Sequence, residues 1–66
     1  MKIKVRIAIL SHLSDAQELM NMGFKDKAYD QITFAKRLVI DYPDTEKYVS
    51  EKELNDLWSE LFEPKK

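Results

Sequence analysis

Three residues that interrupt helices divide this chain into segments. Gly23, Pro43 and Pro64 are the interruptions, and between them apolar residues recur at helical spacing. Glycine adopts the left-handed backbone that often ends a helix, and proline disfavours helical backbone at the residue before it. The sequence therefore predicts an all-α fold, with a helical hairpin around Gly23 followed by a C-terminal helix. Residues 1–66 are expected to form a single small helical domain.

The C-terminal helix has the clearest local signature. Ser50 and Glu53 have the spacing of a capping box, in which each side chain accepts a hydrogen bond from the other residue's backbone N–H. The apolar residues that follow recur every three or four positions, and they are Leu54, Leu57, Trp58, Leu61 and Phe62. Because Pro64 biases the residue before it away from helical geometry, we predict a helix over residues 51–62.

The second helix of the hairpin is predicted just after the glycine. Asp26 is a suitable N-cap for it, since its carboxylate can accept hydrogen bonds from free backbone N–H groups. Its apolar stripe consists of Ala28, Ile32, Ala35, Leu38, Val39 and Tyr42. We predict helix over residues 27–41. Residues 43–49 are expected to form a loop from which Tyr48 and Val49 fold back onto the core.

The N-terminal segment has two interpretations. Residues 2–9 alternate between polar and apolar side chains and are rich in β-branched residues, which favours a strand. Ser14 and Gln17 would then form a capping box that begins a helix at residue 15. A helical stripe also passes through the segment, at Val5, Ile9, Leu13, Ala16, Leu19 and Met20. A lone strand needs a second copy of the chain to satisfy its backbone, so the all-helical fold is our first prediction.

The alternative, a strand over residues 2–9, gives the order strand, helix, glycine turn, helix across residues 2–40. That order resembles the ribbon-helix-helix repressors, in which two chains pair their strands and place the ribbon in the DNA major groove. The resemblance implies a dimeric DNA-binding transcriptional regulator. In such a protein Lys2, Lys4 and Arg6 would contact DNA, because lysine and arginine pair with phosphates and guanine edges.

Two further stretches of sequence, KIKVRIAILSHLSDAQ and ITFAKRLVIDYPDT, resemble small uncharacterised proteins of bacteriophages and related mobile elements. The resemblance implies the cytoplasm of a bacterial or phage-infected cell. It also implies a binding role, such as that of an accessory or inhibitor protein that acts by occupying a partner. It supplies no catalytic residues.

Composition excludes several classes of function. The chain has no cysteine, one histidine and one glycine, which removes disulfides, thiolate zinc sites and glycine-rich phosphate loops. His12 has no arrangement of partners that could activate a nucleophile, so we predict no enzyme, no cofactor and no metal. The longest apolar run covers residues 7–10, far short of the roughly 20 residues of a membrane span, so we expect no membrane partner.

Size points to a protein partner. A 66-residue chain buries only about 60% of its unfolded surface, and oligomerisation is the stabilising device that remains without disulfides or metals. We therefore predict a small, non-enzymatic module that binds a protein partner, a second copy of itself, or both. Nucleic acid is a partner only under the strand alternative. The predicted partner-binding residues are Ile3, Ile7, Leu10, Trp58 and Leu61.

Overall fold

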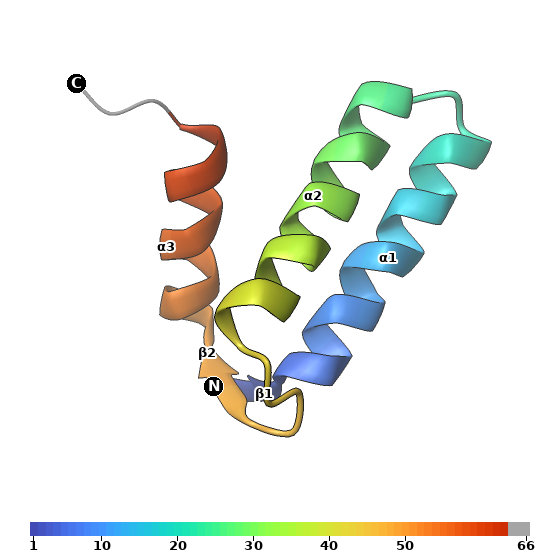
Figure 1. The fold of residues 1–66 in the computed structure, drawn as a ribbon. Coiled ribbons are helices and arrows are strands. Elements are labelled where there is room, and N and C mark those ends of the chain that lie inside the picture. Colours follow the sequence, from blue (N-terminus) through green and yellow to red (C-terminus); the bar gives the residue numbers. More distant parts are fainter. Residues whose placement is uncertain (64–66) are drawn as a thin grey trace.

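A computed structural model describes residues 1–63. The elements follow in the order β1 (Lys2–Lys4), α1 (Val5–Asn21), α2 (Lys25–Asp41), β2 (Tyr48–Ser50) and α3 (Glu51–Phe62). Helices α1 and α2 form an antiparallel hairpin, and α3 follows the small β1–β2 sheet at the base of that hairpin (Figure 1). The predicted three-helix unit is confirmed, with a two-stranded antiparallel sheet added to it.

The hairpin turns at the predicted glycine. Gly23 has a φ of 88°, in the left-handed region that glycine enters without strain, and the Phe24 N–H donates to the Leu19 carbonyl at 2.8 Å. Helix α2 begins at Lys25, two residues before the predicted start. Asp26 is therefore not the N-cap but lies in the first turn, where its negative charge interacts favourably with the helix dipole.

The N-terminal segment combines parts of both interpretations. Strand β1 covers Lys2–Lys4 only, so the predicted strand over residues 2–9 is wrong in length. Its partner is β2 of the same chain, with Ile3 opposite Val49, and no second copy is needed to pair it. The predicted loop over residues 43–49 thus ends in a strand.

Helix α1 begins at Val5 because the loop between α2 and β2 satisfies its first backbone donors. The Val5 N–H donates to the Lys47 carbonyl at 2.8 Å, and the Arg6 N–H donates to the Thr45 carbonyl at 2.9 Å. These bonds replace a side-chain cap, which the N-cap residue Lys4 does not supply. Ser14 lies inside α1, so the capping box expected there is not the start of a helix.

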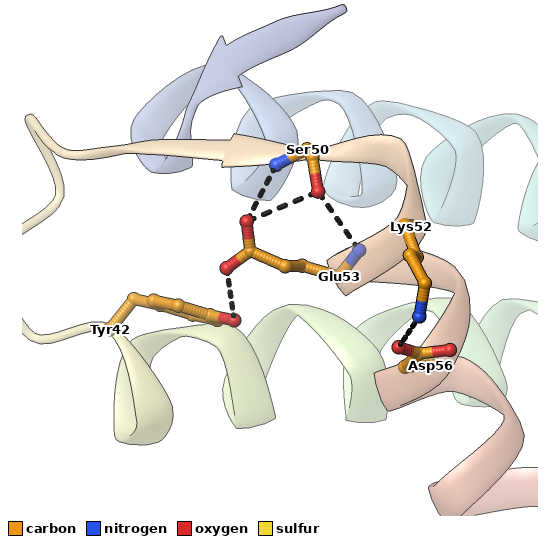
Figure 2. Close-up of polar contacts among 5 residues, drawn as sticks. All are labelled: Tyr42, Ser50, Lys52, Glu53 and Asp56. Carbon is orange, nitrogen blue, oxygen red and sulfur yellow. Dashed lines mark hydrogen bonds and ion pairs between the residues drawn. The ribbon is translucent and has the colours of Figure 1, made fainter.

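Helix α3 covers the predicted residues 51–62, and its capping box is formed (Figure 2). The Glu53 N–H donates to Ser50 Oγ at 3.2 Å, and the Ser50 N–H donates to Glu53 Oε1 at 3.1 Å. These bonds satisfy two donors that a helix start otherwise leaves free. Pro64, which we expected to end the helix, lies outside the described residues.

The core is small and is divided between two kinds of contact. Four of its nine buried apolar residues are alanines, which let α1 and α2 approach closely. Among the larger residues, Phe34, Leu38 and Leu57 lie where α3 meets the hairpin. The nine are Val5, Ala8, Ala16, Ala28, Phe34, Ala35, Leu38, Val49 and Leu57. Val49 folds onto the core as predicted, whereas Tyr48 is 59% exposed because successive side chains of a strand point to opposite faces.

Candidate functional site

The exposed large apolar side chains are concentrated on the helical hairpin. Within residues 51–62, every large apolar side chain is buried or half-buried, so the apolar stripe of α3 packs against the core. In α1 and α2, by contrast, exposed residues recur at intervals of four and three along both helices. We call this set the hairpin face: Arg6, Leu10, Leu13, Gln17 and Met20 on α1, with Lys25, Tyr29, Ile32, Lys36 and Val39 on α2.

The hairpin face lies opposite α3. Helix α3 meets the hairpin through His12 and Phe34, whose rings lie 6.4 Å and 5.1 Å from the Trp58 ring between centroids. Each helical residue advances by about 100°, so Leu13 is turned about a quarter of the way round α1 from His12. Val39, five residues beyond Phe34, is turned about 140° away on α2. The two helices therefore present their stripes on the side that α3 leaves open.

The hairpin face is apolar and positively charged. Six of its ten residues are apolar, three are cations, one is a glutamine and none is an acid. Arg6 Nε lies 3.3 Å from Glu46 Oε2 at one end of the face, in an exposed ion pair of little energetic weight. Lys25 and Lys36 take part in no ion pair within residues 1–63. The face therefore has the charge to attract an acidic partner.

The five predicted partner-binding residues do not form one surface. Leu10 is 57% exposed and belongs to the hairpin face, and Ile7 is 50% exposed but lies on the outer side of α1. The other three are only partly exposed and pack against the core cluster: Ile3, Trp58 and Leu61. Ile32, which shares the apolar stripe of α2 with the buried Ala28 and Leu38, is 38% exposed, and helical spacing alone does not indicate that difference.

The predicted DNA-contacting residues lie at the base of the hairpin. Lys4 Nζ is 3.1 Å from Glu46 Oε1, the carboxylate that also pairs with Arg6. Lys2 is exposed on β1, which pairs within the chain. DNA contact by these three residues stays a prediction, and a neighbouring carboxylate weakens the positive potential that it requires.

A second surface feature is an acidic hollow between the end of α2 and α3, of about 670 Å³. Arg37 pairs with two of its carboxylates, since its guanidinium lies 3.0 Å from Asp41 Oδ1 and 3.4 Å from Glu60 Oε1. Asp56, which also lines the hollow, pairs with Lys52 at 3.2 Å (Figure 2). Across residues 1–63, no cluster of three histidine, aspartate or glutamate side chains is arranged to hold a metal ion.

Two groups in this hollow have shifted pKa values. Hydrogen bonds from the Ser50 backbone N–H and hydroxyl hold the pKa of Glu53 below its usual value. Loss of solvation, followed by the negative charge of Glu53, raises the pKa of Tyr42. The Tyr42 hydroxyl donates to Glu53 Oε2 over 3.4 Å. The capping box accounts for the lowered pKa of Glu53, and lost solvation followed by the charge of Glu53 accounts for the raised pKa of Tyr42, so both shifts have a structural origin.

Comparison of the chain with protein-family models, with curated proteins and with solved structures gives no match. Among the helices of residues 1–63, none has both the length and the apolar character needed to span a membrane.

Proposed function

We propose that this chain is a small, non-enzymatic protein-binding module whose hairpin face receives an acidic amphipathic helix of a partner protein. The observation that supports the proposal is the composition of that face, with six exposed apolar side chains, three cations and no acid. A helix laid along the groove between two antiparallel helices buries apolar side chains at intervals of three and four residues. Carboxylates beside that stripe would pair with Lys25, Lys36 and Arg6.

The size of the hairpin face suits a modest interface. A 17-residue helix is about 25 Å long, and two neighbouring helices are together about 20 Å wide, which gives roughly 500 Å². Weak and transient interfaces bury about 600 Å² or less on each partner. We therefore expect a reversible complex. Because the core is small and rich in alanine, apolar burial in the complex should also stabilise the fold of the chain.

A second copy of the chain is the less favoured occupant. Two-fold pairing of hairpin faces would bring two sets of cations together, which is unfavourable at the distances of a packed interface. Self-association stays a prediction, and sedimentation equilibrium of the chain alone tests it. The DNA-binding alternative has less support, because β1 pairs within the chain and Glu46 accompanies both Lys4 and Arg6. A phage setting rests on the sequence resemblance alone.

The proposal is tested with two synthetic helical peptides of identical leucine spacing, one with glutamates and one with lysines on the flanking positions. We expect the acidic peptide to bind, with an affinity that falls as salt is added. Leu13→Glu or Val39→Glu should weaken binding by about tenfold or more, since each places a carboxylate beneath the bound helix. Tyr48→Glu, a change at an exposed apolar residue of β2 outside the hairpin face, is the control.

Equal binding of the two peptides, or binding that ignores Leu13→Glu, would contradict the proposal. Sedimentation equilibrium of the chain alone distinguishes the remaining case. A dimer that dissociates on Leu13→Glu and not on Tyr48→Glu would assign the hairpin face to a second copy instead.

A further inference from the structure

Three aromatic rings from three different helices meet on the side of the hairpin that α3 covers. The Phe34 ring is nearly perpendicular to the other two, with centroids 4.6 Å from His12 and 5.1 Å from Trp58. The His12 and Trp58 rings are inclined by only 23°, with centroids 6.4 Å apart. Phe34 is buried, whereas His12 and Trp58 are partly exposed. Phe34 thus packs in edge contact with both partly exposed rings.

These rings line an open hollow of about 390 Å³, and three of its four other lining residues are polar. The lining residues besides the rings are Gln31, Glu51, Leu54 and Asn55. Gln31 Oε1 lies 2.6 Å from His12 Nδ1 and accepts a hydrogen bond from its N–H, which fixes the imidazole ring and leaves Nε2 of the neutral ring as an acceptor. Within residues 1–63, no other protein group is hydrogen-bonded to that ring.

The hollow is acidic. Glu51 is its only charged residue at neutral pH, and this carboxylate forms no ion pair in the part of the chain that the structure describes. A neighbouring hollow of about 280 Å³ shares Gln31 and adds Asp15 and Glu18. No lysine or arginine lines either hollow. Together they form a surface, opposite in charge to the hairpin face, that attracts cations and repels phosphates.

We propose that this aromatic hollow binds an arginine side chain of a partner protein. The guanidinium group is flat, stacks on aromatic faces and donates in a fork that matches a carboxylate. Here it would stack on Trp58, donate to Glu51, and offer a further N–H to His12 Nε2. This site is separate from the hairpin face, so the inference does not rest on the proposed function.

The lining of the hollow favours a flat group over a compact one. A guanidinium would lie flat against the partly exposed Trp58 ring while its in-plane N–H groups reach Glu51 and His12 Nε2. A lysine ammonium is compact and more strongly hydrated, so it gains less from a flat ring.

The test uses N-acetyl-arginine amide as the probe and N-acetyl-citrulline amide as a neutral control of the same shape. The probes are titrated into the isotopically labelled chain at pH 7.5, and binding is followed by the NMR signals of the Trp58 indole N–H and the His12 ring. We expect saturable shifts with the arginine probe and an affinity for citrulline that is about tenfold lower.

Variants assign the charge. Glu51→Gln should weaken binding of the arginine probe several-fold, and Glu60→Gln, which removes a carboxylate outside the hollow, should leave it unchanged. Both residues are exposed, so both variants are expected to fold. Equal binding of citrulline, equal binding of N-acetyl-lysine amide, or shifts that remain unsaturated and ignore Glu51→Gln would each overturn the arginine site. The peptide experiment on the hairpin face would be unaffected by that outcome.

Discussion

Two neighbouring residues of α2 test the placement of the core. Leu38 is fully buried, in the cluster that contains Ala8, Phe34 and Leu57, whereas the adjacent Val39 is 49% exposed on the hairpin face. Leu38→Ala removes buried methyl groups and leaves a cavity, so we expect a loss of about 2–5 kcal/mol in the free energy of unfolding. A domain of this size has only roughly 3–5 kcal/mol to lose.

Val39→Ala should change stability very little. Half of its surface is already in water, so the lost burial is on the order of 0.5 kcal/mol, and the higher helix propensity of alanine offsets a similar amount. Urea denaturation followed by circular dichroism at 222 nm measures both variants against the parent chain. The slope of the transition should stay constant for Val39→Ala.

Equal losses for the two variants would refute this placement of the core. The two positions differ by about 100° around the helix, so such a result would mean that α2 is rotated from the orientation described. If Leu38→Ala does not fold at all, Leu38→Met provides the measurement, because this swap nearly conserves volume and should cost less than about 1.5 kcal/mol.

Four further predictions concern the capping box, Tyr42 and the Gly23 turn. Ser50→Ala should lower the free energy of unfolding by about 1 kcal/mol, measured by urea denaturation at pH 7, because the Glu53 N–H loses its acceptor. The lowered pKa of Glu53 stabilises the fold at neutral pH, and this contribution should disappear as the pH falls below the ordinary glutamate value of about 4.3. Conversely, the raised pKa of Tyr42 should make stability decline as the pH rises above about 10, and Tyr42→Phe should remove that alkaline decline in a thermal melt series. Gly23→Ala should lower the free energy of unfolding by about 1 kcal/mol or slightly more. Backbone strain is the cause, because an added Cβ meets no atom within 4 Å. Gly23→Asn, which tolerates this backbone better, should cost less.

The parts of the fold that the sequence predicts well are those that local contacts decide. Helix α3 has its predicted bounds because Ser50 and Glu53 satisfy each other across one turn. The Gly23 turn is likewise a local matter of backbone conformation. These signals depend on residues no more than a few positions apart, so spacing alone is enough to read them.

The N-terminus could not be predicted in the same way. Helix α1 begins at Val5 because the Lys47 carbonyl accepts a hydrogen bond from the Val5 N–H. Strand β1 forms because it pairs with β2, more than 40 residues later in the chain. Neither partner is adjacent in sequence. The alternation over residues 2–9 was misleading because Ile7 is an exposed isoleucine within a helix, and it completes a strand-like pattern by coincidence.

The candidate binding surfaces were only partly predictable for a related reason. Helical spacing shows which residues share a stripe, but it does not show which of two stripes meets α3. Val39 therefore shares one apolar stripe with Leu38 in the sequence, although Leu38 is buried and Val39 is 49% exposed. The aromatic hollow needed three helices to bring His12, Phe34 and Trp58 together, and no spacing within one helix indicates such a meeting.

The pairing of β1 with β2 has a consequence for the order in which the chain folds. The first strand to be synthesised must wait for Tyr48–Ser50, which follow both helices of the hairpin. The α1–α2 hairpin is built from contacts near in sequence and can form early, whereas closing the sheet requires a long loop to be ordered. We expect substitutions at the alanine contacts of the hairpin to slow folding, and substitutions at Ile3 or Val49 chiefly to speed unfolding. The sheet is therefore expected to form late in folding, when it fixes the N-terminal strand to the segment that leads into α3.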